Sequence, residues 1–386
     1  MKDFVFFNPV KIYFGKKCMK YFEKECAKWG KKALLVYGKG SIKKNGVYRT
    51  IVNSLKNAGI DFVEFSGVRP NPVLSHTRKG IEIAKREKVD FVIAAGGGSV
   101  IDESKAICAG AKVDFDVWKF YLGEETPKEA LPLITVLTLP ATASEMNMGS
   151  VITDEESGLK LSMGGEALYP KASFLNPEFT FTLPKEQVVY GTVDAISHIV
   201  EPYFNHTAEY NSISLNIADG ILKTLKTECE NILKEPENYN FRANHMWAIT
   251  VAFNGLVRAG LGRSEFPNHA IEHAISGLFP EVAHGAGLAV VMPAWMRFVK
   301  EEKRDLLIRF SANLFGKNIA SPDEAVTLFK TWLSSIGAPV SLKEIGVGKE
   351  DIPEIASIAS KIIENWGLNR DIYTVENVVK ILEFAL

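Results

Sequence analysis

The sequence predicts an α/β N-terminal domain with a doubly wound, mostly parallel sheet, followed by an all-α C-terminal domain. Three observations predict this fold class. Strand-like and helix-like segments alternate from residue 33 to residue 139, as a wound α/β fold requires. The run at 33–37 is continuously apolar, which is typical of parallel strands buried on both faces. After Pro184 the apolar periodicity becomes almost wholly helical.

The length of the chain favours two domains, because 386 residues exceed what one typical hydrophobic core accommodates. We place the division near Pro184 to Thr192, where the helical periodicity begins. The first predicted domain covers residues 1–187 and the second covers residues 188–386.

The N-terminal half begins with an apolar segment, residues 4–14, which we interpret as two short strands separated at Asn8-Pro9. Such a hairpin needs a partner, because an isolated one is marginal in water. The regular alternation of strands and helices follows this segment. Its strands are expected at 33–37, 62–65, 91–95 and 133–139, and its helices at 47–58, at 75–86 and from residue 100.

A glycine-rich turn, Gly96-Gly97-Gly98-Ser99, joins the strand at 91–95 to the next helix. Glycine lets backbone N–H groups approach an anion, and the helix N-terminus adds partial positive charge. The turn therefore favours a diphosphate, although a plain tight turn has the same composition. The pattern is not GxGxxG, so a conventional Rossmann arrangement is not expected in detail.

A polar loop at residues 140–145 follows the strand at 133–139 and offers hydroxyl groups. Residues 151–154 and 159–162 predict a β-hairpin in which Lys160 is the only cation between apolar neighbours. Without further context, Lys160 is interpreted as a solvated surface lysine. The helices of the second half are expected near 185–204, 211–233, 242–259, 269–278 and 285–300, with several more to the C-terminus.

Two short apolar segments of the second half contain four of the seven histidines. Asp194 with His198, and His269 with His273, are each four residues apart, so each pair lies on one helix face. His284 follows before a Gly-Ala-Gly turn. Any one ring could be satisfied by a backbone carbonyl, but one carboxylate and three imidazoles together can hold Zn or Fe(II). Spacing alone leaves open which histidine is not a ligand.

Composition excludes several classes of partner. The formal net charge of -1 gives no reason to expect nucleic acid or an anionic membrane surface. No apolar run approaches the length of a membrane span, and the N-terminus lacks the pattern of a signal peptide. We therefore expect a cytoplasmic protein. The four cysteines have no CxxC spacing, which favours buried thiols over disulfides or a cysteine metal site.

The order of motifs along the whole chain resembles the iron-containing, group III alcohol dehydrogenases, and within them the branch of butanol dehydrogenases and broad aldehyde reductases. The motifs are NPVKIYFGK, YGKGSIKKNGV, VRPNPV, GGGSVID, ATASEMN, ALYPKASFLNPEFTFTLP, GTVDAISH, HAIEH and HGAGLAVVMPAW. The resemblance implies a dehydroquinate synthase-like architecture. It also implies hydride transfer between NAD(P)(H) and a small primary alcohol or aldehyde.

The resemblance also implies which residues bind the metal. The ligands fall on Asp194, His198, His269 and His284, while His273 is a non-ligand near the nicotinamide and substrate. One departure is visible, because the interval between His269 and His284 is one residue longer than usual. The placement of His284 therefore rests on its HGAGLA context. The resemblance favours Fe(II), although Zn(II) satisfies the same ligands, and either could polarise an alcohol or aldehyde oxygen.

The resemblance places the cofactor on the first domain. Residues at the glycine-rich turn are expected to hold the diphosphate, and others to lie along the ribose and nicotinamide. The cofactor-binding residues expected in this way are Asn71, Gly97, Gly98, Ser99, Asp102, Thr138, Thr142 and Lys160. A histidine pKa suits proton exchange near neutrality, so His273 is expected to be catalytic, within a proton relay.

A second loop bears on which dinucleotide is used. Gly38-Lys39-Gly40-Ser41 follows the first long strand and contains no acid that would bond a ribose 2′-hydroxyl. Its glycines, its hydroxyl and its lysine suit a 2′-phosphate, so we expect NADP(H) to be favoured over NAD(H). The alternative is that the lysines of this loop are ordinary solvated surface charges and do not bind a phosphate.

Two other functions compete with this interpretation. A dehydroquinate synthase-like or glycerol dehydrogenase-like metal enzyme would share the architecture, and a non-catalytic dinucleotide-binding protein would use the histidines only for stability. Near the metal motifs the cations are mainly Arg258 and Arg263, flanked by Trp247, Phe253 and Leu256, which favours a small apolar alcohol. The resemblance finally implies a homodimer that pairs through the N-terminal strands.

Overall fold

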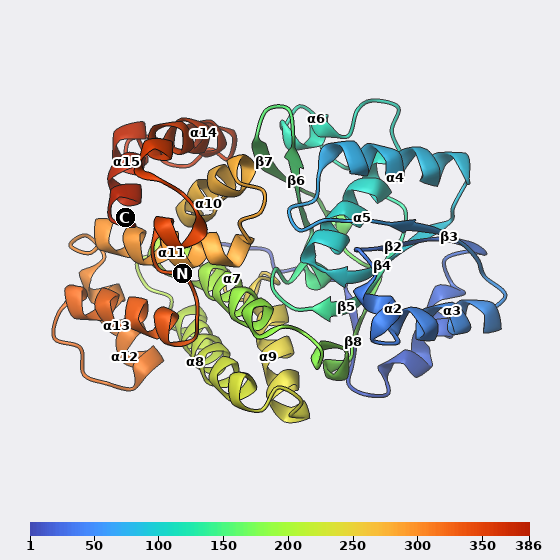
Figure 1. The fold of residues 1–386 in the computed structure, drawn as a ribbon, viewed down its shortest axis with the longest axis horizontal. Coiled ribbons are helices and arrows are strands. Elements are labelled where there is room, and N and C mark those ends of the chain that lie inside the picture. The colour runs from blue at the N-terminus through green and yellow to red at the C-terminus, as the bar shows by residue number, and fades with distance from the viewer.

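The computed structural model describes all residues 1–386. A six-stranded sheet, parallel throughout, forms the centre of the N-terminal part, in the order β1-β8-β5-β4-β2-β3 (Figure 1). Its strands are β1 (Lys11–Phe14), β2 (Lys32–Tyr37), β3 (Asp61–Ser66), β4 (Phe91–Gly97), β5 (Leu133–Leu139) and β8 (Ala172–Leu175). The predicted doubly wound, parallel sheet is confirmed.

Helices cover both faces of this sheet, because its central strands are apolar on both sides. One face packs Leu35, Ile93 and Val136 against the first three helices, and the other packs Val36, Val92 and Leu137 against the next two. The first group is α1 (Phe22–Cys26), α2 (Ser41–Lys44) and α3 (Val47–Asn57), and the second is α4 (Leu74–Arg86) and α5 (Gly98–Gly110).

The two glycine-rich loops meet at one edge of the sheet. Strands β2 and β4 are parallel neighbours, with Tyr37 opposite Ala95, so the segments that follow them leave the sheet side by side. The carboxyl edge of a parallel sheet is where open α/β folds bind ligands. Strand β4 continues through Gly97, so the turn before α5 is tighter than the sequence pattern suggested.

The predicted N-terminal hairpin is wrong. Residues 4–7 form no strand and leave Val5 94% exposed, because no backbone in the chain pairs with them. The second predicted strand does form, as β1, but it pairs with β8 in parallel. Strand β8 and the short helix α6 (Trp118–Tyr121) were not predicted, since each has only four residues and little periodicity.

The predicted β-hairpin forms a separate sheet of β6 (Gly149–Asp154) and β7 (Leu159–Gly164). Strand β7 packs against α10 and α14 of the helical part, so the hairpin bridges the two halves of the molecule (Figure 1). Lys160 on β7 therefore points into the junction and is only 3% exposed.

The C-terminal part is helical, as predicted. Its helices are α7 (Lys185–Phe204), α8 (Ser212–Lys234), α9 (Tyr239–Ala252), α10 (Pro267–Leu278), α11 (His284–Phe298), α12 (Arg304–Phe315), α13 (Pro322–Ser335), α14 (Ile352–Asn365) and α15 (Val375–Glu383). Helix α9 ends at Ala252, before the expected residue 259. Short 3-10 helices occupy Cys18–Tyr21, Ser144–Met146, Glu166–Leu168, Pro177–Thr180, Leu342–Ile345 and Lys349–Asp351. None of the helices is long and apolar enough to cross a membrane.

Candidate metal centre and cofactor cleft

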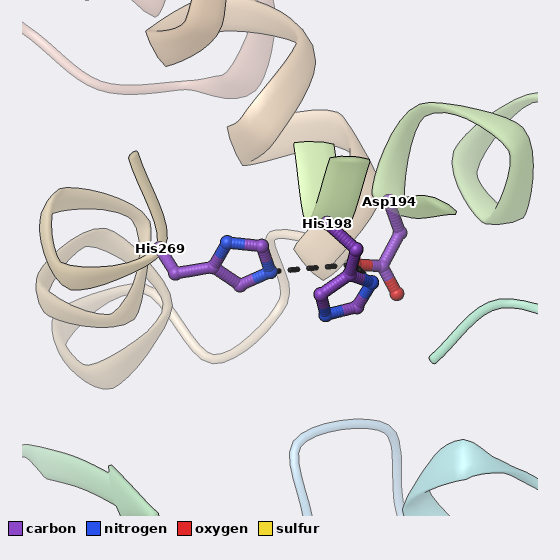
Figure 2. Close-up of side chains that lie close together, drawn as sticks. All are labelled: Asp194, His198 and His269. Carbon is purple, nitrogen blue, oxygen red and sulfur yellow. Dashed lines mark ion pairs between the residues drawn. The ribbon is translucent and has the colours of Figure 1, made fainter. Parts of the chain in front are cut away.

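Three helices bring the predicted metal-binding side chains together. Asp194 and His198 lie one turn apart on α7, His269 lies in the first turn of α10, and His284 is the first residue of α11. Figure 2 shows the rings of His198 and His269 beside the Asp194 carboxylate. The longer interval between His269 and His284 is accommodated by the turn between α10 and α11. The His284 ring therefore also reaches the Asp194 carboxylate.

The distances in this cluster fit a metal. Asp194 Oδ1 lies 3.4 Å from His198 Nδ1 and 3.5 Å from Nε2 of both His269 and His284. Ligand bonds of about 2.1 Å in a tetrahedral site give ligand–ligand separations of about 3.4 Å. Asp194 Oδ1, His198 Nδ1 and His269 Nε2 are also buried without any hydrogen-bond partner. Buried polar atoms rarely remain unpaired, so these four residues could hold a divalent metal.

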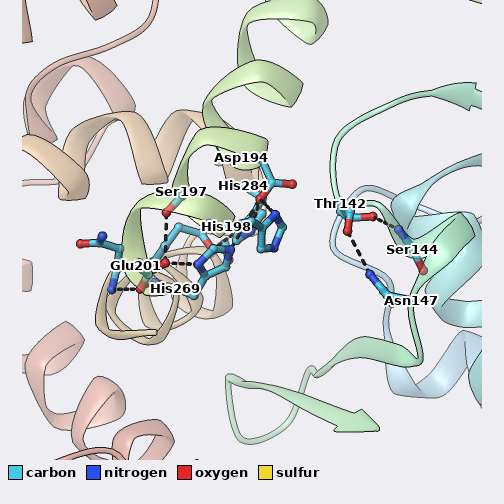
Figure 3. Close-up of polar contacts among 12 residues, drawn as sticks. Thr142, Ser144, Asn147, Asp194, Ser197, His198, Glu201, His269 and His284 are labelled. Carbon is cyan, nitrogen blue, oxygen red and sulfur yellow. Dashed lines mark hydrogen bonds and ion pairs between the residues drawn. The ribbon is translucent and has the colours of Figure 1, made fainter. Parts of the chain in front are cut away.

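Two buried glutamates orient two of these rings. Glu201 accepts a hydrogen bond from His269 Nδ1, and Glu272 accepts one from His284 Nδ1. Each bond fixes the tautomer in which Nε2 faces Asp194, as carboxylates commonly do behind metal-binding histidines. Glu201 itself accepts a hydrogen bond from Ser197 Oγ at 3.0 Å (Figure 3). It accepts another from the Asn268 backbone N–H at 2.7 Å.

Electrostatics hold two members of this cluster in the form that binds a cation. Burial would lower the pKa of a third, His269, but Glu201 and Asp194 raise it to about 10, so this ring must lose its proton when a metal binds. Burial alone would raise the pKa of Asp194, but the imidazoles of His198 and His284 lower it well below its usual range. Burial lowers the pKa of His198 to about 3, so its ring is neutral at physiological pH. The pair therefore offers an ionised carboxylate and a neutral imidazole, the forms that metals require.

His273 lies in the same cleft but makes a different contact. Its Nδ1 donates to the Lys160 carbonyl at 3.0 Å, which leaves Nε2 as the unprotonated nitrogen. Burial, followed by the charge on Lys160, lowers the His273 pKa well below its usual value. From the sequence alone, the pKa of His273 was expected to lie near neutrality. The buried ring is instead neutral over the physiological range and suits the acceptor position of a proton relay.

Lys160 is not a solvated lysine. Its Nζ donates to Asn71 Oδ1 at 3.0 Å, Ser276 Oγ at 2.9 Å and Glu272 Oε2 at 3.3 Å. Asn71 in turn donates to the Val282 carbonyl at 3.2 Å. The two predicted cofactor residues thus tie the hairpin to α10 and the turn before α11, and both line the cleft.

The edge of the sheet faces the metal cluster across this cleft. Gly98 begins α5, and a Cβ there would lie 2.4 Å from Thr142 Oγ1, so only glycine allows this close approach. Ser99, Asp102 and Thr142 line the cleft, and Figure 3 shows Thr142 opposite the metal cluster. Thr138 is buried in β5, and Gly97 and Gly98 lie just behind the lining residues. Backbone N–H groups at a helix N-terminus suit an anionic diphosphate.

The loop that precedes α2 lies beyond the cleft lining, at the same edge of the sheet. Lys39 and Ser41 are exposed, and Gly40 has φ 114°, a conformation that favours glycine. Lys43, which follows this loop in α2, forms an ion pair with Glu64 at 3.2 Å. Gly38 lies against the Val68 carbonyl. Of the two lysines, Lys39 alone has no paired carboxylate.

The cleft between the sheet edge and the helices has a volume of about 510 Å³. Six of its 27 lining residues are hydrophobic, and the others are polar, charged or small. Phe253, Arg258 and Arg263 line it as expected, but Trp247 and Leu256 do not, and these two side chains are 42% and 37% exposed. The prediction that Trp247 and Leu256 flank the site is therefore wrong. Helix α9 ends at Ala252, so the chain changes direction before Leu256.

Comparisons with known proteins agree with this geometry. The chain matches the iron-containing alcohol dehydrogenase family over residues 9–177, and the C-terminal region of Fe-containing alcohol dehydrogenases over residues 188–386. The chain belongs to the iron-containing alcohol dehydrogenase family. The expectation drawn from its motifs is confirmed.

Several relatives in the iron-containing alcohol dehydrogenase family span its full length. A probable NADH-dependent butanol dehydrogenase 2 of Bacillus subtilis is 38% identical, with 100% of both chains covered. The NADPH-dependent aldehyde reductase YqhD of Escherichia coli is 35% identical, over 96% of this chain and 95% of that one. The crystal structure of an NADH-dependent butanol dehydrogenase A from Thermotoga maritima superposes with a TM-score of 0.96 at 43% identity, covering 100% and 99% of the two chains.

Several residues of this iron-containing alcohol dehydrogenase site were not singled out from its sequence. Glu201, Glu272 and Lys105 are charged residues in otherwise apolar helices, and burial of an isolated charge is costly. That pattern alone could have flagged them. Lys105 Nζ donates to Ser144 Oγ at 2.8 Å and the Gly149 carbonyl at 2.7 Å, which anchors the loop beside Thr142. Their partners are far away in sequence, so only the fold reveals them.

Proposed function

We propose that this enzyme transfers hydride between NAD(P)(H) and a small primary alcohol or aldehyde, with a divalent metal at Asp194, His198, His269 and His284. One observation carries the proposal. Buried atoms of Asp194, His198 and His269 that lack hydrogen-bond partners converge on one wall of the cleft, and the N-terminus of α5, at Gly98, lies at the opposite wall. When bound, the metal would polarise the substrate oxygen as a Lewis acid, and the nicotinamide would carry the hydride.

The protein's own residues bind, orient and exchange protons. Gly97, Gly98 and Ser99 offer backbone N–H groups to the diphosphate, while Thr138 and Thr142 flank its course along the sheet edge. Lys160 and Asn71 hold the hairpin against the helical part and face the cofactor from the cleft wall. His273 accepts the proton that leaves the alcohol, through Nε2, since its Nδ1 is engaged by a carbonyl.

The proposed metal is Fe(II), in keeping with the family to which the chain belongs. The test is replacement of His269 with Ala. Metal content and turnover should both collapse in this variant, while dinucleotide binding largely survives, because the cofactor residues lie within the proposed domain at 1–187 and the ligands within 188–386. Elemental analysis, a coupled absorbance assay with butanol, and calorimetric titration with dinucleotide measure the three quantities. Unchanged metal content would show that the ligand assignment is wrong.

We propose NADP(H) as the favoured cofactor. The relatives named above include both NADH-dependent and NADPH-dependent enzymes, so the argument rests on this chain's own loop. Lys39 is exposed and lacks a carboxylate partner, and no acid occupies Gly38 to Ser41. In wild type, kcat/KM should be higher for NADP(H) than for NAD(H), and Lys39→Asp should reverse or erase that ratio. A wild type that favours NAD(H) contradicts the proposal.

We further propose a cytoplasmic homodimer. The four cysteines are buried free thiols, which suits a reducing compartment. Phe4, Phe6 and Phe7 are each about half exposed, in the segment that precedes β1, and β1 is an edge strand of the sheet. An exposed apolar strand edge favours pairing with another chain. Light scattering at micromolar concentration should give twice the mass of the chain, and a monomeric mass would contradict this.

A further inference from the structure

Arg258 is a charged residue of the cleft with no charge to balance it. Its guanidinium forms no ion pair and no side-chain hydrogen bond, and it lies over Phe253 at 5.9 Å and Phe266 at 5.2 Å. The other cleft arginine, Arg263, is already engaged by the Gly367 carbonyl and by Glu265 at 3.4 Å. Arg258 therefore keeps its hydrogen-bonding donors free for a ligand, since an arginine presents five of them.

The position of Arg258 relates it to the metal centre. Phe253 stacks on His198 with ring centres 4.2 Å apart, and Phe266 packs edge-on against His269 at 5.7 Å. The guanidinium carbon thus lies at most about 10 Å from the centre of the His198 ring, and both contact Phe253, an aromatic ring of the kind that holds cations. A short substrate bound at the metal would reach it with its distal end.

The surroundings favour an anion at that end. Arg258 is an exposed residue that lines the cleft, and its guanidinium lies over the rings of Phe253 and Phe266. A cation set against aromatic rings in a cleft gains more from an anionic partner than one in bulk water does, because the local dielectric is lower. Arginine also matches the bidentate geometry of a carboxylate, which a lysine does not.

We propose that Arg258 is a specificity-determining residue, and that the preferred substrates are short aldehydes or alcohols whose far end carries a carboxylate. This inference rests on the proposed dehydrogenase function and narrows its substrate class. In the reductive direction the aldehyde carbon gains a hydride from the reduced nicotinamide and the oxygen gains a proton. The carboxylate is unchanged and serves only to anchor the substrate.

The test compares two four-carbon aldehydes, butanal and succinate semialdehyde, which differ by a terminal carboxylate. The metal-loaded wild type should reduce succinate semialdehyde with the higher kcat/KM. Arg258→Gln should lower that value about ten- to a hundredfold, the range of a hydrogen bond to a charged group, and mostly through KM. Its kcat/KM for butanal should change less than about threefold, which shows that the variant is folded and loaded.

The control is Arg263→Gln, which removes the other arginine of the cleft. Because the Arg263 guanidinium is already engaged, its loss should affect the two aldehydes to a similar degree. Arg258→Lys should recover part of the selectivity, since it restores the charge without the bidentate geometry. If wild type and Arg258→Gln show the same ratio of kcat/KM between the two aldehydes, the inference is overturned. If the loaded wild type reduces neither aldehyde with either dinucleotide, the proposed function itself fails.

Discussion

Glu201 lies behind the proposed metal site and holds the ring of His269. Its carboxylate is fully buried and receives four hydrogen bonds, from His269 Nδ1, from Ser197 Oγ at 3.0 Å, and from the backbone N–H groups of Asn268 at 2.7 Å and His269 at 3.4 Å. Replacing Glu201 with Gln keeps the shape but removes the charge and one acceptor oxygen. The amide would then present N–H groups to a donor.

The expected cost follows from these contacts. A hydrogen bond to a charged group contributes about 1.5–3 kcal/mol, and partners behind metal ligands typically change metal affinity by about ten- to a hundredfold. We expect Glu201→Gln to weaken metal binding within that range, because His269 loses the bond that fixes its tautomer. Competition against a chromogenic chelator, with Zn(II) or with Fe(II) under anaerobic conditions, measures the affinity directly.

The control is Ser197→Ala, which removes one neutral donor to the same carboxylate. It should cost about 0.5–1.5 kcal/mol of folding stability and leave metal affinity nearly unchanged. Circular dichroism establishes that both variants are folded. A folded Glu201→Gln protein that binds metal as tightly as wild type would refute the assignment of Glu201 as the residue that positions His269.

Three further predictions test other parts of the structure. His273→Ala should retain metal yet lose rate and change the pH dependence of kcat, whereas wild-type kcat at every pH would indicate a purely structural role. Lys105→Met should lower Tm and raise KM for the dinucleotide, because the Ser144 hydroxyl and the Gly149 carbonyl lose their donor; an unchanged KM would contradict this. Burial lowers the pKa of His245 to about 3 from 6.5. The neutral ring therefore contributes to the free energy of unfolding in full above pH 6.5. That contribution is lost, at about 1.4 kcal/mol per pH unit, as the pH falls from 6.5 towards 3. Denaturation across this range should show a shallower pH slope in His245→Gln than in wild type.

Periodicity was sufficient to predict most of the fold. The central strands β2, β4 and β5 are mainly apolar, and α7 was predicted at its observed limits, Lys185–Phe204. The failure at residues 4–7 has a physical cause. Apolarity shows that a segment needs to be covered but does not identify the covering surface, and no strand of the same chain pairs with these residues.

The site was predicted less completely than the fold. Four-residue spacing placed Asp194 with His198 on one face of α7, and the structure brings His269 and His284 to the same carboxylate oxygen. The state of Lys160 could not be predicted, because its partners Asn71 and Ser276 lie 89 and 116 residues away. The pKa of His273 was misjudged for the same reason, since it depends on burial and on a neighbouring charge that sequence does not display.

The balance of buried charge links these observations to the kind of metal the site accepts. Asp194, Glu201 and Glu272 are at most 2% exposed, and Lys160 is the one buried ammonium within reach of them. Burial would lower the pKa of His269, but the charges of Glu201 and Asp194 raise it to about 10. A protonated His269 therefore offsets one of the three carboxylates, and Lys160 offsets a second. Metal binding requires the deprotonated ring, which leaves about two negative charges to balance, each of which would cost several kcal/mol. A divalent cation at Asp194 would cancel both, while a monovalent cation would leave one. We therefore expect the site to prefer a divalent cation, because of the glutamates behind the histidines.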